Sequence, residues 1–67
     1  MTKFEILDRV LELLAKAERS VDELSTEIGT REEVADYVLR ILLEHGIIEF
    51  KNGKYRLTET GRKLAGL

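Results

Sequence analysis

The sequence predicts a small α+β domain in which three helices precede a two-stranded hairpin and a short last helix. Start signals of the form Ser/Thr-x-x-Glu open three segments in the first half of the chain and indicate the helices. After Gly46, apolar residues recur at every second position, and the turn dipeptide Asn52-Gly53 interrupts them, which is typical of a hairpin. With 67 residues, the chain is predicted to form one domain over residues 1–67.

Each helix start is predicted to be a capping box, in which a hydroxyl and a carboxylate satisfy free amides of the first turn. The pairs are Thr2 with Glu5, Ser20 with Glu23, and Thr30 with Glu33. Gly29 and Gly46 indicate helix ends, because glycine readily adopts the left-handed cap conformation. The predicted helices span about residues 3–17, 21–28 and 31–45. Only Gly29 and Thr30 separate the second from the third, as in a helix-turn-helix.

A two-residue turn at Asn52-Gly53 fixes the register of a hairpin over about residues 47–57. It pairs Lys51 with Lys54, Phe50 with Tyr55, Glu49 with Arg56, and Ile48 with Leu57. One predicted face is apolar and consists of Ile48, Phe50, Tyr55 and Leu57. The other face is charged, and we expect Glu49 to form an ion pair with Arg56. Thr58 is predicted to start the last helix, over about residues 59–65.

Composition restricts the functions open to this chain. It contains no cysteine, which excludes disulfides and thiolate sites and suits a reducing cytosol. The single histidine, His45, excludes a multi-histidine metal site, and the sequence contains neither a glycine-rich phosphate loop nor a catalytic constellation. No apolar run approaches the roughly 20 residues of a membrane helix. We therefore expect a cytoplasmic domain that is no enzyme and uses no cofactor, metal or small-molecule substrate.

Charge is divided unevenly along the chain. The formal net charge is −2, yet residues 1–45 carry 6 Lys/Arg against 11 Asp/Glu, whereas residues 46–67 carry 5 against 2. The first part is therefore net −5 and the second net +3. The basic charge belongs to the hairpin and the last helix.

The ordered elements resemble the winged helix-turn-helix family. The resemblance rests on "SVDELSTEIGT", "VLRILLEHGIIEF" and "GKYRLTETGRKL", in that order. It implies a small bacterial or archaeal transcription regulator that binds double-stranded DNA, with its third helix in the major groove. The hairpin, called the wing, would contact phosphates or a minor groove, and a short strand near residues 19–21 would join its sheet.

The exposed face of the predicted third helix is acidic, which is unfavourable for an element that binds DNA. Its exposed side is predicted to carry Glu33, Asp36, Tyr37, Arg40 and Glu44. Phosphate neutralisation supplies most non-specific DNA affinity, so the wing is the stronger candidate for backbone contact. The candidate DNA-contacting residues are Arg31, Tyr37, Arg40, Lys51, Asn52, Lys54 and Arg56. Lysines at a hairpin tip also protect sheet edges from aggregation, so Lys51 and Lys54 fit either role.

The helix predicted over residues 3–17 has a wide apolar arc, of roughly 200°. It contains Phe4, Ile6, Leu7, Val10, Leu11, Leu13, Leu14 and Ala17. A homodimer through this helix or the last one would explain the width, although a helix packed between two others also needs a wide arc. Two further hypotheses stay open. One is a protein-interaction winged helix without DNA binding, and the other is a designed sequence, suggested by the regular capping boxes and the absence of proline and cysteine.

Overall fold

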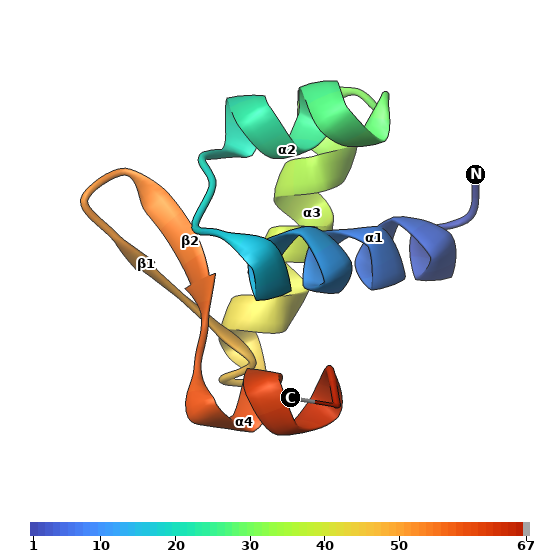
Figure 1. Ribbon diagram of the computed structural model, residues 1–67. Coiled ribbons are helices and arrows are strands. Elements are labelled where there is room, and N and C mark those ends of the chain that lie inside the picture. Colours follow the sequence, from blue (N-terminus) through green and yellow to red (C-terminus); the bar gives the residue numbers. More distant parts are fainter. Residues whose placement is uncertain (67) are drawn as a thin grey trace.

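The computed structural model describes residues 1–66, which form a body of packed helices from which one two-stranded hairpin projects (Figure 1). The elements are α1 (Lys3–Lys16), α2 (Val21–Ile28), α3 (Glu32–Glu44), β1 (Ile48–Lys51), β2 (Lys54–Leu57) and α4 (Glu59–Leu64). Helix α1 crosses α3, α2 lies at one end of α3, the hairpin extends to one side, and α4 lies below the hairpin base. This is the predicted α+β class and element order.

Two of the three predicted capping boxes form. The hydroxyl of Thr2 accepts from the Glu5 amide at 3.2 Å, and the Glu5 carboxylate accepts from the Thr2 amide at 2.9 Å. Ser20 and Glu23 repeat the arrangement at the same two distances. These hydrogen bonds hold the pKa values of both glutamates below the ordinary value, because they favour the ionised carboxylate.

The predicted capping box of Thr30 and Glu33 is wrong. Helix α3 is capped one residue later, at Arg31, whose side chain makes no capping hydrogen bond. The amide of Thr30 instead donates to the carbonyl of Ser25 at 3.0 Å. Thr30 therefore completes the end of α2, and the connection has three residues, Gly29, Thr30 and Arg31, where two were predicted.

Helix α3 ends in a Schellman motif that directs the chain into β1. The amide of Gly46 donates to the carbonyl of Leu43 at 3.0 Å, and that of Ile47 to the carbonyl of Leu42 at 2.9 Å. Gly46 has a φ of 67°, which only glycine adopts without strain. The end of the third helix is thus one residue earlier than expected, with His45 as its cap.

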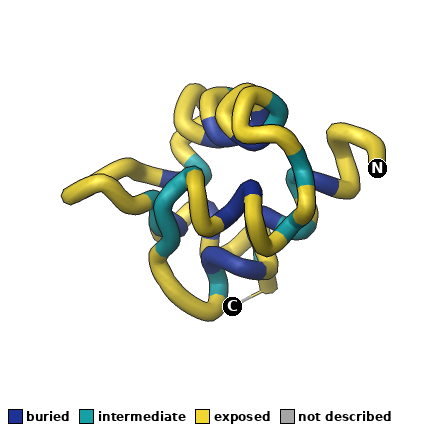
Figure 2. Tube along the Cα trace, turned by 90° about the horizontal axis from the view of Figure 1, so that it is seen from above, coloured by how far each residue is buried: buried dark blue, intermediate teal, exposed yellow. Residues whose placement is uncertain are grey.

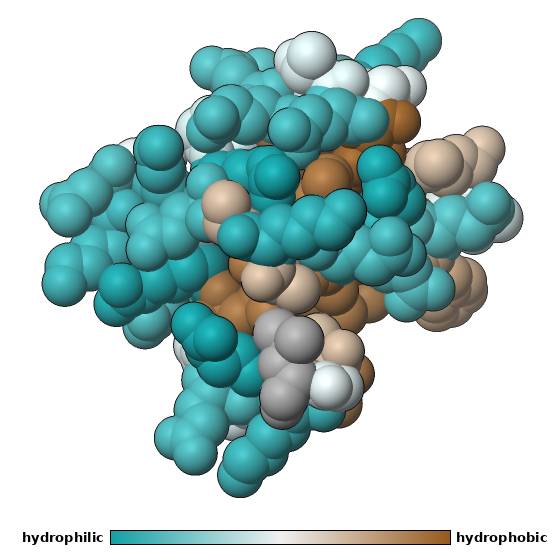
Figure 3. Space-filling model, in the orientation of Figure 1, coloured by the Kyte–Doolittle hydropathy of each residue, from teal (hydrophilic) through white to brown (hydrophobic). Residues whose placement is uncertain are grey.

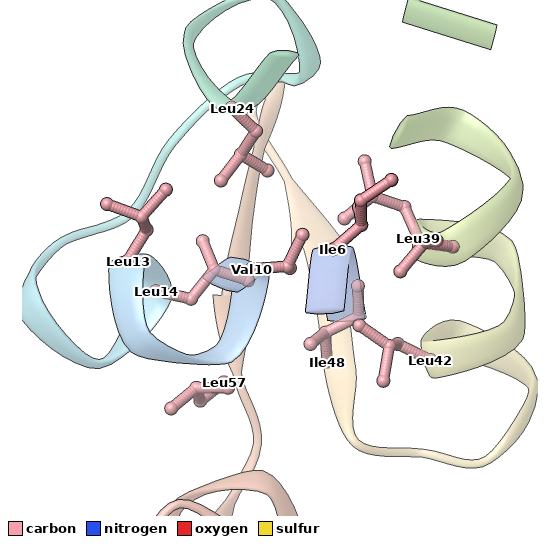
Figure 4. Close-up of a cluster of buried hydrophobic side chains, with 10 residues drawn as sticks. Ile6, Val10, Leu13, Leu14, Leu24, Leu39, Leu42, Ile48 and Leu57 are labelled. Carbon is pink, nitrogen blue, oxygen red and sulfur yellow. The ribbon is translucent and has the colours of Figure 1, made fainter. Parts of the chain in front are cut away.

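The hydrophobic core lies where α1, α2, α3 and the base of the hairpin meet (Figure 4). It consists of Ile6, Val10, Leu13, Leu14, Leu24, Val38, Leu39, Leu42, Ile48 and Leu57. Leu24, the only one of these from α2, has no exposed surface. Complete burial of such a side chain contributes about 1.5–3 kcal/mol, so this one residue does much to hold α2 on the core.

The hairpin has the predicted register, from Ile48 opposite Leu57 to Lys51 opposite Lys54. Asn52 and Gly53 have φ values of 54° and 80°, as a two-residue turn of this type requires. A bridge at Arg19 extends the sheet, since its carbonyl accepts from the amide of Tyr55 at 2.8 Å and its amide donates to the Tyr55 carbonyl at 3.2 Å. Arg19 therefore occupies the place of the short strand that the resemblance implied.

Only the base of the hairpin joins the core. Ile48 and Leu57 are 2% and 5% exposed, Tyr55 is half-buried, and Phe50 is 55% exposed. The hairpin projects from the body of the domain, and the end that carries the turn is exposed (Figure 2). The predicted apolar face of the hairpin is thus buried at Ile48 and Leu57 but exposed at Phe50, because the strands extend past the core.

Candidate nucleic-acid interface

The outward face of α3 is acidic, as the sequence predicted. The side chains on it are Glu33, Asp36, Tyr37, Arg40 and Glu44, and all are exposed. Arg40 Nη2 lies 3.7 Å from Asp36 Oδ2, and both side chains are more than half exposed. An ion pair this open adds little to stability, but it offsets the positive charge that this face could offer to a phosphate.

A cation from α1 lies beside this face of α3. The Nζ atom of Lys3 is 5.4 Å from the centroid of the Tyr37 ring, within the range of a cation–π contact. Lys3 was not among the predicted interface residues, because it belongs to a helix far from α3 in the sequence. Arg31, which was predicted, is exposed at the start of α3.

The first turn of α3 meets α2 through two carboxyl groups. A hydrogen bond and the negative charge of Asp22 raise the pKa of the exposed Glu32 carboxyl, and Asp36 and Glu33 add to the effect. The raised pKa reflects the repulsion between neighbouring carboxylates when both are ionised. This end of α3 is therefore unfavourable for a phosphate, and polyanion contact is better suited to the wing.

The tip of the wing carries Lys51, Asn52 and Lys54, all exposed. Neither lysine forms an ion pair with another residue of the described range 1–66. The two lysines are directly opposite one another in the ladder. Two exposed cations at the end of a projecting hairpin give it the local charge of a phosphate-contacting element.

Arg56 differs from these lysines because carboxylates hold it. Its Nε atom donates to Glu49 Oε1 at 2.6 Å, which confirms the expected cross-strand pair. Its Nη1 atom is 3.9 Å from Glu18 Oε2, in the connection between α1 and α2. Arg56 thus links the wing to that connection, and its charge is offset by two glutamates.

The aromatic pair of the hairpin lies on the face opposite Arg56. The rings of Phe50 and Tyr55 have centroids 4.8 Å apart at an interplanar angle of 56°. The pKa of Tyr55 is raised by burial and then by the charge of Asp36 on α3. The same face of the hairpin carries the buried Ile48 and Leu57, so its base packs on the core. Consecutive strand residues point to opposite faces, so Lys51 and Lys54 share the face of Arg56, opposite the two rings.

The sequence placed Phe50 on the apolar face of the hairpin, and the exposure of its side chain was not predicted. Its position next to the turn was the available signal, since a residue beside the tip of a projecting hairpin has few neighbours. In Figure 3 the visible side of the hairpin is mostly hydrophilic. Within residues 1–66, no cluster of three or more His, Asp or Glu side chains could hold a metal ion. No helix in that range is long and apolar enough to cross a membrane.

Comparison with known proteins agrees with this geometry. Residues 1–67 match the family described as the N-terminal domain of the methanogenesis regulatory protein FilR1. The chain belongs to the FilR1 N-terminal domain family. An uncharacterized protein of Archaeoglobus fulgidus is 32% identical over 63 residues, which cover 94% of this chain and 71% of that relative.

A solved structure shares the fold of this member of the FilR1 N-terminal domain family. The crystal structure of T. acidophilum IdeR matches it with a TM-score of 0.73 and 22% sequence identity. The match covers 97% of this chain but only 32% of the other, so the chain spans about a third of that protein's length. At this identity the likeness establishes the winged-helix fold alone.

Proposed function

We propose that this domain binds double-stranded DNA for a transcription regulator, with the tip of the wing on phosphates and α3 in the major groove. The observation that carries the proposal is the pair Lys51 and Lys54, exposed at the tip and in none of the ion pairs formed among residues 1–66. Lys54 lies close enough to Glu23 of α2 to help lower the pKa of that carboxyl. The family takes its description from a regulatory protein, FilR1, and this description supports a role in the control of gene expression.

The proposed contacts differ in strength. Lys51, Asn52 and Lys54 contact the backbone, because they project furthest and Asn52 adds an amide beside the two charges. Arg31, Tyr37 and Arg40 supply limited base readout from α3, where the acids weaken any phosphate contact. Arg56 contributes least, because two glutamates hold its guanidinium.

A salt series tests this proposal. Affinity for mixed-sequence duplex DNA should fall with salt, and Lys51→Ala or Lys54→Ala should each reduce the log–log slope by about 1. Arg9→Ala, which removes a cation of α1 that pairs with Glu12 far from the wing tip, is the control and should leave the slope unchanged. Binding that is absent, or independent of salt and of both wing lysines, would contradict the proposal.

We also propose that the domain is a homodimer through α1 and α4. Phe4 is 77% exposed on α1 and Leu64 is 62% exposed on α4. Between the two helices is a shallow groove lined by Asp8, Leu11, Glu12, Ala15, Lys16, Leu64 and Ala65. Hydrophobic side chains gather between α1 and α4 in Figure 3.

Charge favours a second copy as the occupant of this groove. Asp8 and Glu12 border it on α1, whereas α4 exposes Arg62 and Lys63. In a two-fold dimer the acidic edge of α1 in each copy can face the basic α4 of the other copy. The symmetry produces this contact twice. The alternative is that a different protein occupies the groove and that the domain is a protein-interaction module. Measurements that show a monomer without DNA affinity would favour this alternative.

A further inference from the structure

We propose that the outer edge of β1 pairs with the same edge of a second copy, so that two wings join antiparallel across a two-fold axis at Phe50. This contact goes beyond the proposed DNA binding, because it needs no nucleic acid. It also differs from the proposed interface of α1 and α4, because it uses the hairpin alone.

The backbone of Phe50 has hydrogen-bonding groups that the hairpin does not use. Tyr55, its partner in the ladder, exchanges both of its backbone hydrogen bonds with Arg19, at 2.8 and 3.2 Å. Opposite residues of an antiparallel pair alternate between those that bond each other and those whose backbone groups point apart. Phe50 and Tyr55 are therefore of the second kind, and the amide and carbonyl of Phe50 are directed to the outer edge of β1.

This part of the edge is open to a partner. Among residues 1–66, β1 pairs with β2 alone, and the turn end of the hairpin projects free of other elements in Figures 1 and 2. Phe50 is 55% exposed, and Glu49 and Lys51 beside it are also exposed, whereas Ile48 at the base is buried. An unpaired edge is a template for another strand, and here the template is Glu49–Lys51.

The sequence of β1 is complementary to itself. With the axis at Phe50, the amide of each Phe50 donates to the carbonyl of the other. The same register places Glu49 of each copy opposite Lys51 of the other, and opposite charges in this position stabilise a strand pair. An axis at Glu49 or Lys51 would instead place like charges opposite one another. Charge therefore favours a second copy in one register.

Both charged groups are available for this contact. None of the ion pairs formed among residues 1–66 involves Lys51, which within its own hairpin faces another lysine, Lys54. Arg56 lies on Oε1 of Glu49, which leaves the second carboxylate oxygen for the lysine of a partner. Pairing of two wings would thus replace a like-charge contact by two opposite-charge contacts.

The size of the contact determines when it forms. Three residues from each strand bury far less than the roughly 1,200–2,000 Å² of a stable specific interface. The contact is therefore weak and joins copies that are already at high local concentration. The proposed dimer through α1 and α4 remains the stronger of the two.

Single cysteines test the register, because the chain contains no cysteine of its own. Glu49→Cys protein is mixed with isotope-labelled Lys51→Cys protein in a glutathione buffer, and mass spectrometry measures the linked pairs. In the proposed register these positions face each other with Cα atoms about 4.5 Å apart, within reach of a disulfide. The mixed disulfide should therefore form in about tenfold preference to either homodisulfide. This mixed pair also retains the second contact of Glu49 with Lys51.

Lys54→Cys is the matched control, because Lys54 is exposed in the same hairpin but lies on β2. Mixed with Glu49→Cys, it should give the statistical ratio of products. Both mixtures are repeated with Phe4→Glu and Leu64→Glu added, which removes the proposed α1 and α4 contact and should leave the preference unchanged. A statistical ratio for Glu49→Cys with Lys51→Cys would overturn the proposal.

Amide spectra of the unmodified chain test the hydrogen bonds themselves. As protein concentration rises to the millimolar range, the Phe50 amide should shift and exchange more slowly with water. The Tyr55 amide, already bonded to Arg19, should not change. A Phe50 amide that does not respond to concentration would contradict edge pairing. No DNA is present, so failure here leaves the proposed DNA binding untouched.

A charge exchange separates pairing from the fold of the wing. Glu49→Lys should abolish the response of the Phe50 amide, and the double variant Glu49→Lys, Lys51→Glu should restore it. The double variant restores opposite charges between copies but not the bond from Arg56 to Glu49, so a merely structural role of Glu49 would not be rescued. Loss of the response in both variants would therefore refute the proposed register.

Discussion

Gly61 shows how one residue fixes the junction between the wing and α4. It is buried, and a Cβ atom built there would fall on the carbonyl oxygen of Ile47. The same oxygen accepts from both the amide and the hydroxyl of Thr58, each at 3.0 Å. A larger residue must therefore move backbone and also disturb the cap of α4.

Gly61→Ala should destabilise the domain despite the higher helix propensity of alanine. The propensity gain is about 1 kcal/mol, whereas overpacking costs about 1–3 kcal/mol and a disturbed buried hydrogen bond about another 1 kcal/mol. We expect a net loss of about 1–3 kcal/mol in the free energy of unfolding, measured in urea. Thr60→Ala, an exposed neighbour in the same helix, should change it by less than about 0.5 kcal/mol. Equal stability of the two variants would refute the clash.

At the scale of elements, the side chain and backbone of Arg19 join three parts of the fold. Its guanidinium donates to the carbonyls of Leu13 and Ala17 at the end of α1, and its Nε atom lies 2.8 Å from Glu27 of α2. Its side chain is only 15% exposed. Together with the backbone bridge to Tyr55, Arg19 thus connects α1, α2 and the wing.

Arg19→Ala should therefore cost much more than the loss of an ordinary surface arginine. It leaves two carbonyls and a carboxylate without their partner, and we expect a loss of about 1–3 kcal/mol in unfolding free energy. Arg9→Ala is the matched control, because Arg9 meets Glu12 on the surface of α1 at 3.3 Å. That change should cost less than about 0.5 kcal/mol. Comparable losses for both variants would show that Arg19 contributes no more than a surface pair.

The elements also show what the sequence could predict. Helix types, the hairpin register and the caps at Thr2 and Ser20 follow from local signals, which short-range hydrogen bonds enforce. The start of α3 was misplaced because the closure of α2 competes for Thr30. The exposure of Phe50 depends on how far the wing extends past the core, and the contacts of Arg19 depend on which elements lie beside it. The alternation of apolar and polar residues along a strand carries no information about either.

At the scale of the whole molecule, the basic wing and the groove between α1 and α4 are two separate surfaces. The helical part is net −5 and the part after residue 45 is net +3, so DNA would be drawn to the wing before it meets α3. The groove between α1 and α4 contains neither of the wing lysines. The proposed DNA binding and the proposed dimer formation therefore involve different residues, and variants can separate them.

Dimer formation through α1 and α4 would couple folding to protein concentration. A domain of 67 residues has a small core, so covering Phe4 and Leu64 adds a notable share of its stability. The melting temperature should rise by about 3–5 °C per tenfold increase in concentration, and sedimentation should give twice the 7.7 kDa of one chain. The double variant Phe4→Glu, Leu64→Glu should be a folded monomer whose melting temperature is independent of concentration. Thr26→Glu adds a charge to the exposed face of α2 and should remain dimeric. A parent protein that sediments as one chain at high concentration would refute the interface, and the apolar groove would then favour a different protein partner.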